Sequence, residues 1–383
     1  MISIPIPIPM TCRNVAGTRN FKIYIMNSYQ SVRKHLETNG PIEASAPVRV
    51  DLGGTLDIST LHYPMRHLNP LTFNAAVGLR TRIRLQPFTD GRVKVSSRGF
   101  TAADFEGGLA PFDHPLGLMF AVAGYFGLTG VHIDIQSASP PRSALGGSSS
   151  AAVALAAACA ELLLATGQSA GLNRRQAAGL AHHVEAGVAG VPCGLQDQLA
   201  AAFGGVHAWH WRGGPDGTQY EREVLLVDDG IDWFEKRVLL AYCGQPHESR
   251  NINSRWLAQF LEARTRSDWA EIVDCTRCFV DAMKKGDAAG AALWMNREAA
   301  VRRRMTPDVL DDLGTRLCAA AEEAGCGARF TGAGGGGCIW AFGRQADIEK
   351  LKPRWAAQTE SIATAAPLAF TVDTEGIRVN SKP

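Results

Sequence analysis

A glycine- and serine-rich segment between a strand-like and a helix-like stretch constrains this chain more than any other feature. It reads Pro-Arg-Ser-Ala-Leu-Gly-Gly-Ser-Ser-Ser-Ala from Pro141 to Ala151. Residues 131–135 before it alternate between apolar and polar, as in a strand. Residues 152–164 after it are apolar on nearly every face, as in a buried helix. Because a first helical turn has unpaired N–H groups and glycine permits close approach, the segment predicts a phosphate-binding site.

The composition fits a folded chain without a strong charge. With 383 residues and 46% hydrophobic composition, we expect a large core and two domains. A net charge of +2 gives no electrostatic basis for binding nucleic acid or an anionic membrane. The nine cysteines are dispersed, which is typical of reduced thiols. We therefore expect a cytoplasmic protein with a small-molecule partner and no nucleic-acid or membrane partner. The oligomeric state stays open, with a homodimer as one alternative.

The order of the expected elements indicates an α+β fold. We expect strands at residues 46–52, 74–87, 92–97, 131–135, 205–209, 237–242 and 367–372, two more strands around a tight turn within 329–342, and helices at 115–126, 152–164, 174–187, 194–203 and through most of 254–324. The second and third strands are expected to be antiparallel. Strands first, then helices, then returning strands are typical of an α+β protein. Residues 1 to about 25 are expected to be loosely attached.

A second glycine cluster spans residues 331–338 and reads Thr-Gly-Ala-Gly-Gly-Gly-Gly-Cys. Consecutive glycines cost backbone entropy and are tolerated where the chain passes close to another group. A tight β-turn alone would explain this run. Together with the first segment, it favours a shared phosphate site.

Four carboxylates and one arginine are candidates for chemistry. Asp197 falls in the first turn of an expected helix, where an aspartate is often only a cap. Arg49 and Asp51 share one face of an expected strand, either as a surface ion pair or as a polar pocket wall that includes Asp57. Glu185 follows two histidines, a run that can suggest a metal site, although a solvated helix end is favoured for the histidines.

The three glycine-containing segments, in this order, resemble the motifs of the GHMP kinases, the family of galactokinase, homoserine kinase and mevalonate kinase. The strand with Arg49 resembles the first motif. Residues 141–151 resemble the second, usually written P-x-x-x-G-L-G-S-S-A, and residues 331–338 resemble the third. The resemblance implies a ribosomal-S5-like α/β domain followed by a ferredoxin-like α+β domain. It divides the chain into an N-terminal extension (1–43), an ATP-binding domain (44–210) and a C-terminal domain (211–383).

The resemblance also implies an ATP-dependent kinase that uses Mg²⁺. The residues expected to bind ATP are Pro141, Ala144, Leu145, Gly146, Gly147, Ser148, Ser149, Ser150, Gly334 and Gly335. Mg²⁺ would lie between Glu185 and a serine, Ser148 as first choice and Ser149 as second. Asp197 matches the catalytic aspartate that accepts the proton of the attacking hydroxyl. Arg49 would stabilise the transferring phosphoryl group and keep Asp197 ionised.

The acceptor is predicted from two segments. The motif at residues 51–57 resembles the G-G-x-x-D type of heptose and fucose kinases and lacks the Gly-Glu-His-Thr-Asp-Tyr run of galactokinases. Residues 190–198 are similar to galactokinases and, extended to residue 205, to bacterial heptose-phosphate kinases. The residues expected to bind the acceptor are Asp57, Thr55, Gly194 and Gln196.

These segments predict phosphorylation of the anomeric hydroxyl of a sugar like D-glycero-D-manno-heptose 7-phosphate. A galactokinase-like or fucokinase-like enzyme and a non-catalytic regulator that binds nucleotide or sugar are the alternatives. A dinucleotide-dependent oxidoreductase is disfavoured, because the loop lacks GxGxxG spacing and an N-terminal βαβ context.

Overall fold

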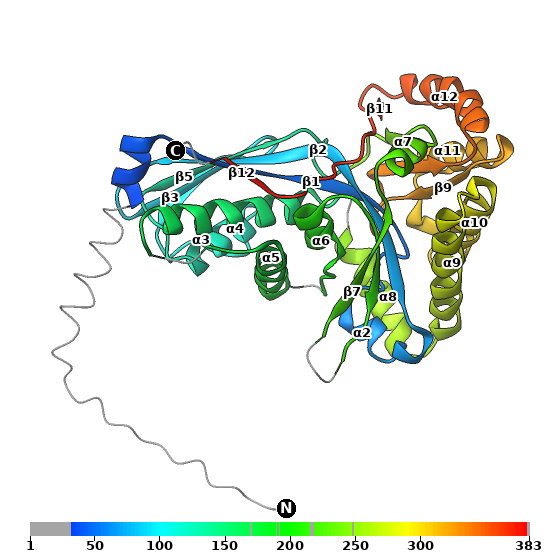
Figure 1. Ribbon diagram of the computed structural model, residues 1–383, viewed down its shortest axis with the longest axis horizontal. Coiled ribbons are helices and arrows are strands. Elements are labelled where there is room, and N and C mark those ends of the chain that lie inside the picture. The colour runs from blue at the N-terminus through cyan, green and yellow to red at the C-terminus, as the bar shows by residue number, and fades with distance from the viewer. Residues whose placement is uncertain are drawn as a thin grey trace, which may run out of the picture.

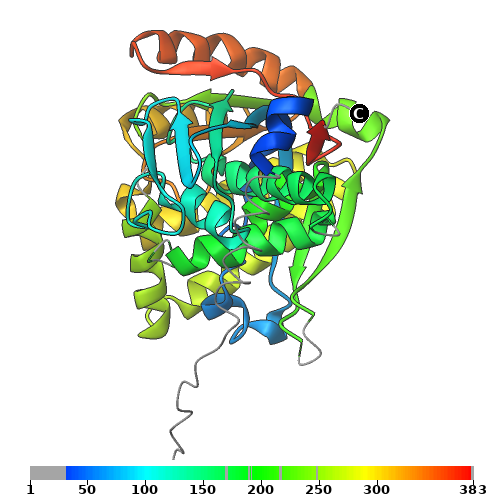
Figure 2. The ribbon, with the colours of Figure 1, turned by 90° about the vertical axis from the view of Figure 1, so that its left-hand side faces the viewer.

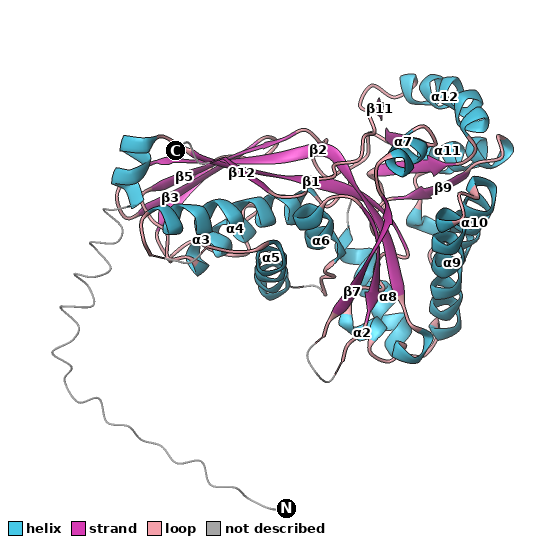
Figure 3. Cartoon of the chain, viewed as in Figure 1, coloured by secondary structure: helices cyan, strands magenta, loops and turns pink. Residues whose placement is uncertain are grey.

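The computed structural model describes residues 32–168, 171–188, 190, 192–214, 218–246 and 249–380. The expectation of a loosely attached segment before about residue 25 lies outside these residues. The described chain forms two parts, each with its own sheet (Figures 1 and 3).

The first part contains β1 (Ile42–Leu52), α2 (Ser59–His62), β2 (Leu71–Pro87), β3 (Arg92–Ser97), β4 (Ala103–Glu106), α3 (Gly117–Tyr125), β5 (Val131–Ser137), α4 (Gly147–Ala165), α5 (Arg174–Val188), α6 (Gln196–Phe203), β6 (Val206–Trp211) and β7 (Tyr220–Leu226). The second contains α7 (Asp229–Glu235), β8 (Val238–Tyr242), α8 (Ser249–Leu261), α9 (Arg266–Lys284), α10 (Ala288–Met305), α11 (Asp312–Glu323), β9 (Gly327–Phe330), β10 (Cys338–Phe342), α12 (Gln345–Glu360) and β11 (Ala366–Leu368). The last strand, β12 (Arg378–Asn380), returns to the first part.

The larger sheet is built around the long strand β2. Its strand order is β12-β1-β2-β5-β3-β4, and β6 and β7 continue from the other end of β2. As expected, β2 and β3 run antiparallel, but they are not neighbours: β5 lies between them, antiparallel to β2 and parallel to β3. Alternation of apolar residues identifies the faces of a strand but does not identify its neighbour.

Strand β1 changes its packing partners near Pro47. Ala44 and Ala46 lie in the core between the larger sheet and its helices, whereas Val48 and Val50 lie in the core shared with the smaller sheet. The register against β2 shifts between Pro47 and Val48. Such an irregularity re-aims the side chains that follow it. After Pro47, the odd-numbered residues of β1 therefore face the helical side of the sheet, where the first turns of α4 and α6 lie.

Helices α3, α4, α5 and α6 cover one face of the larger sheet (Figure 1). By length and composition α4 is apolar enough to cross a membrane, but 72% of its apolar window is buried within the fold. We therefore assign α4 as the core helix beneath the sheet. This layer brings the first turns of α4 and α6 close to β1.

The smaller sheet has the order β11-β8-β10-β9 and packs against the helices of the second part. Helix α12 lies at the outer edge of this part, in orange in Figure 2. Aromatic residues join the two parts: Phe73 of β2 lies edge-on to Phe279 of α9 and stacks on Trp340 of β10. The site described below therefore rests on both parts.

The expected domain boundaries differ from these packing units in three places. Residue 210 falls within β6, whose hydrogen-bonded neighbour β7 belongs to the same sheet. Strand β12, near the C-terminus, pairs with β1. Residues 32–39 form a helix, and Val32 and Leu36 are buried in the core, so this part of the expected extension is integral to the fold. We propose that the first domain runs from about residue 32 to the end of β7 and includes β12.

Candidate active site

The glycine-rich segment expected to bind phosphate leads from β5 into α4. Gly146 precedes the helix with φ of 78°, a left-handed conformation, and as a glycine it has no side chain to cap the first turn. The N–H groups of this turn are therefore available to an anion. A Cβ at Gly146 would lie 2.9 Å from Oδ2 of Asp197. Glycine here keeps the space between the loop and that carboxylate open.

Two residues of this segment hold it in place. Leu145 is buried in the core shared with the smaller sheet, and its carbonyl accepts the N–H of Arg49 at 3.0 Å. The hydroxyl of Ser150 donates to the carbonyl of Ala46 at 2.8 Å. The side chains of Leu145 and Ser150, which we expected in the ATP site, lie outside the cavity lining and fix the loop on β1 instead.

Ala144, which stands where the resembled motif has glycine, adopts a φ of 61°. A left-handed conformation costs a residue with a Cβ roughly 1–2 kcal/mol. We therefore expect Ala144→Gly to raise the free energy of unfolding by about 0.5–1 kcal/mol in a denaturant titration. The matched control is Ala157→Gly, which is as buried as Ala144 but lies inside α4 and is expected to lose about 1 kcal/mol. A loss of stability in Ala144→Gly would contradict the strain.

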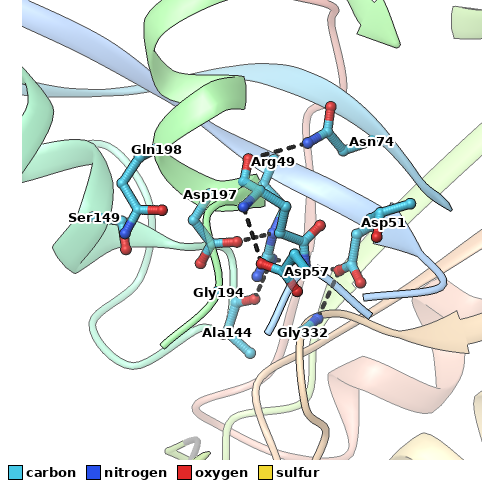
Figure 4. A network of polar contacts seen from close by, with 12 residues as sticks. Arg49, Asp51, Asp57, Asn74, Ala144, Ser149, Gly194, Asp197, Gln198 and Gly332 are labelled. Atoms are coloured by element: carbon cyan, nitrogen blue, oxygen red, sulfur yellow. Dashed lines mark hydrogen bonds and ion pairs between the residues drawn. The ribbon is translucent and has the colours of Figure 1, made fainter. Parts of the chain in front are cut away.

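Arg49 and Asp197 form an ion pair at the junction of β1 and α6 (Figure 4). Nε of Arg49 donates to Oδ1 of Asp197 at 2.7 Å, and Nη1 donates to the carbonyl of Ala144 at 2.7 Å. The side chain of Arg49 is almost wholly buried, whereas that of Asp197 is 23% exposed. One guanidinium therefore touches both the glycine loop and the aspartate expected to be the base.

The second glycine cluster packs against the first loop, as expected of a shared site. The N–H of Gly332 donates to Oδ1 of Asp51 at 2.7 Å. A Cβ at Gly337 would lie 2.7 Å from Cβ of Ala144, so only glycine allows this contact. Gly332 and Ala333 line the cavity.

Gly334 and Gly335, which we expected to bind ATP, lie elsewhere. A Cβ at Gly334 would collide with Val309, and the N–H of Gly335 donates to the carbonyl of Val309 at 2.8 Å. Neither glycine lines the cavity. Their conformations serve the packing of the β9–β10 turn on the segment before α11. The cavity wall in this cluster comes from its first residues instead.

The expected acceptor residues lie together around Asp57. Oδ2 of Asp57 accepts the N–H of Gln196 at 3.0 Å, which ties the carboxylate to the start of α6. A Cβ at Gly194 would overlap the carboxylate of Asp57, so glycine is needed there. Thr55 lies in the left-handed region, with φ of 71°, within the turn after β1. Thr55, Asp57, Gly194 and Gln196 all line the same cavity as Asp197.

Glu185 of α5 faces the first turn of α4. Its carboxylate accepts the hydroxyl of Ser149 at 2.7 Å and that of Ser148 at 3.3 Å. Nε2 of Gln198 donates to the same carboxylate at 2.7 Å. His182 instead interacts through Nδ1 with the carbonyl of Gly194 at 3.0 Å. The expected Glu185–serine pair is thus present, and Ser149, our second choice, is the closer partner.

One cavity of about 870 Å³ connects these groups. It extends from Arg98, Phe100 and Phe112 past the glycine loop to Asp57. Its volume is in the range of small-molecule sites. The aromatic end of the cavity could not be predicted from the sequence, because isolated aromatic residues in loops carry no motif.

Another missed residue is Asn74 of β2, which orients the start of α6. Its amide donates to the carbonyl of Gln196 at 3.1 Å, and its Oδ1 accepts Nε1 of Trp209 at 2.9 Å. A polar residue in an otherwise apolar strand was the available signal, because a buried amide needs partners.

Burial raises the pKa values of three carboxyl groups in the cavity. The pKa of Asp57 rises to about 6, mainly because burial disfavours its charge. The pKa of Glu185 is also raised by burial, against the hydrogen bond from Ser149. The pKa of Asp197 is raised by burial although Arg49 opposes the shift. Arg49 thus favours the ionised form of Asp197, as expected, but burial outweighs it.

Comparisons with known proteins identify two domains in this chain. Residues 116–205 match the GHMP kinases N terminal domain, and residues 279–360 match the GHMP kinases C terminal domain. A protein named mevalonate kinase from Thermococcus gammatolerans is 25% identical over 264 residues, which cover 65% of this chain and 69% of that protein.

Solved structures share the fold at lower identity. A D-glycero-D-manno-heptose 1-phosphate kinase from Bacteriodes thetaiotaomicron aligns with a TM-score of 0.68 and 19% identity, over 89% of this chain and 99% of that one. The Lactococcus lactis galactokinase complexed with galactose aligns with a TM-score of 0.65 and 19% identity, over 92% and 98%. The chain thus contains the N-terminal and the C-terminal domain of the GHMP kinases, in that order, and it shares the fold of these solved kinases.

Proposed function

We propose that this protein transfers the γ-phosphate of ATP to a sugar hydroxyl, with Asp197 as the general base. The orientation of Asp197 carries the proposal. Its Oδ1 accepts Nε of Arg49, while its Oδ2 faces Gly146 in the phosphate-binding loop. Within the described part of the chain, Oδ2 accepts no hydrogen bond, so one carboxylate oxygen is available beside the loop. Phosphoryl transfer depends on positioning and charge compensation more than on covalent catalysis, and this site supplies both.

In the proposed mechanism, each group of the cavity has one task. The N–H groups of the first turn of α4 bind the phosphates. Asp57 accepts hydrogen bonds from hydroxyls of the acceptor and orients it. Oδ2 of Asp197 accepts the proton of the attacking hydroxyl. The guanidinium of Arg49 stabilises the negative charge that the transferring group carries at the loop.

The oxygens of Ser148, Ser149 and Glu185 fit a magnesium site. Mg²⁺ is usually held by one or two carboxylates, substrate phosphates and water, so it needs no larger cluster of protein ligands. Among the described residues, no group of three or more His, Cys, Asp or Glu side chains is placed to hold a metal ion. Glu185 with Ser149, the closer hydroxyl, would hold the ion. The ion would neutralise charge on the phosphates.

We further propose a sugar as the acceptor, with the anomeric hydroxyl of a heptose 7-phosphate as the first candidate. A buried carboxylate such as Asp57 is a strong acceptor for hydroxyl groups. The structural neighbours named a heptose 1-phosphate kinase and a galactokinase support a sugar. The motif around Asp57 supports heptose over galactose.

Mevalonate is the second candidate, because the relatives matched by sequence are named mevalonate kinases. Mevalonate carries a carboxylate, which needs a cation. Among the described side chains that line the cavity, the cations are Arg49, Arg98 and Arg142. Arg49 is paired with Asp197, and the other two are exposed beside the glycine loop. This lining favours uncharged hydroxyls at Asp57, and a sugar phosphate group would have to point away from it.

A substrate panel tests the acceptor. ADP release is measured with heptose 7-phosphate, free heptose, fucose, galactose and mevalonate at equal concentrations, with Asp57→Asn as the matched control. We expect the highest kcat/KM with heptose 7-phosphate and a lower kcat/KM for the sugars in Asp57→Asn. Higher kcat/KM with mevalonate than with every sugar would overturn the sugar assignment. Turnover of galactose alone would overturn the preference for heptose.

A further inference from the structure

Behind Arg49, on the side away from the cavity, buried charges alternate in sign from β1 to α10. Asp51 lies 3.2 Å from Nη1 of Arg329, whose Nε donates to Glu298 at 2.8 Å. Glu298 in turn accepts Nε of Arg302 at 2.9 Å. These four side chains are 0% exposed. With Arg49 and Asp197 they form a row of three anions and three cations.

A row of buried charges adds little net stability to a fold, because burying each charge costs free energy. Each buried ion loses several kcal/mol of hydration, and apolar residues of the same volume often stabilise as well or better. The far end has further fixed partners: Arg302 lies over the rings of both Trp256 and Trp269 and donates to the carbonyl of Gly54 at 2.6 Å. A contribution to stability therefore does not by itself explain why charged residues stand at these positions. The contacts that these residues make with the cavity wall give a better explanation.

Asp51 contacts two residues of the cavity wall, one on β1 and one on the β9–β10 turn (Figure 4). Its Oδ1 accepts the N–H of Gly332 at 2.7 Å and lies 3.5 Å from Nη1 of Arg49. Arg49 and Gly332 both line the cavity. Its Oδ2 faces Arg329, and its backbone carbonyl accepts Nε1 of Trp340 at 3.1 Å. Asp51 thus has few ways to move, and it holds a side chain of β1 against the backbone of the β9–β10 turn.

We propose that Asp51 is a positioning residue for phosphoryl transfer, which fixes the guanidinium of Arg49 and the Gly332 backbone relative to the glycine loop. The inference rests on the proposed function, in which Arg49 stabilises the transferring group. Without the anion behind it, Arg49 keeps its bonds to Asp197 and Ala144 but loses the contact that sets its depth in the cavity. Small displacements of a group at the reacting centre lower the rate strongly, by about 100-fold for 1 Å.

Asp51→Asn tests this, because asparagine keeps the shape and can still accept the N–H of Gly332. The matched control is Glu298→Gln, which removes one equally buried anion and also contacts Arg329 but touches neither Arg49 nor Gly332. We expect kcat to fall by about 100-fold in Asp51→Asn, with the KM for ATP within about threefold of wild type. Glu298→Gln should keep kcat within about threefold of wild type, even if its melting temperature falls by as much as that of Asp51→Asn.

The outcomes separate the inference from the proposed function. Equal kcat in the two variants would overturn the positioning role of Asp51 and show that the row of buried charges has only a structural role. If Asp51→Asn does not fold, Asp51→Asn combined with Arg329→Gln removes one charge of each sign and takes its place, with the same expected fall in kcat. Asp197→Asn is assayed in parallel. Full turnover of Asp197→Asn would overturn the proposed function itself, whereas an inactive Asp197→Asn beside a fully active Asp51→Asn overturns the inference alone.

Discussion

Replacing Asp197 by asparagine is expected to lower kcat by about 10²- to 10⁴-fold without weakening the binding of ATP. The amide keeps the size of the side chain and can still accept Nε of Arg49 through its oxygen. It cannot accept the proton of the attacking hydroxyl. The phosphate-binding N–H groups of α4 do not involve Asp197, so the affinity for ATP should stay within about threefold, which is less than 1 kcal/mol.

Single-turnover and steady-state assays measure this, with calorimetry for the affinity of ATP. The matched control is Asp134→Asn, a carboxylate on β5 that accepts the hydroxyl of Ser96 and does not line the cavity. It should keep wild-type kcat. An Asp197→Asn enzyme with more than a tenth of wild-type kcat would exclude a general base at this position. A wild-type protein that binds ATP and sugar without turnover would instead support a non-catalytic regulator.

The features that could be predicted from the sequence are those set by neighbouring residues. The stretch from Pro141 to Ala151 follows a strand and leads into a buried helix, as expected, because its signals are contained within one continuous stretch; α4 begins earlier than expected, at Gly147. Arg49 and Asp51 share one face of β1 because side chains alternate along a strand. Asp197 does fall in the first turn of a helix. Its approach to Gly146 could be expected only from the family resemblance.

The features that escaped prediction depend on residues distant in the chain. Val309 decides which half of the second glycine cluster faces the cavity, because Gly334 and Gly335 pack against it. Ser149 lies closer than Ser148 to Glu185 because of the phase of α4 against α5, and a run of three consecutive serines does not reveal that phase. The insertion of β5 between β2 and β3 is likewise a choice among possible neighbours, since each strand alternates in the same way.

The second large effect is expected at Asp57, where function and stability are opposed. The pKa of this buried carboxyl is raised from 3.8 to about 6. A raised pKa means that the folded protein binds the proton more tightly than the unfolded chain does. Ionisation of Asp57 therefore destabilises the fold as the pH rises from about 4 to about 6, and the full penalty applies above that range. Two pKa units correspond to about 3 kcal/mol.

Asp57→Asn should therefore be more stable than wild type by about 2–3 kcal/mol at pH 8, and the difference should disappear near pH 4. Asparagine can still accept the N–H of Gln196, so the start of α6 keeps its partner. Denaturant titrations at both pH values measure the effect, with Asp134→Asn as the control that stays within about 0.5 kcal/mol. The same substitution should raise the KM for the acceptor by about 10- to 100-fold, since hydrogen bonds to a charged group contribute about 1.5–3 kcal/mol. A variant that is no more stable at pH 8 than at pH 4, relative to wild type, would show that the Asp57 carboxylate is not strained by burial; an unchanged KM would show that it does not bind the acceptor.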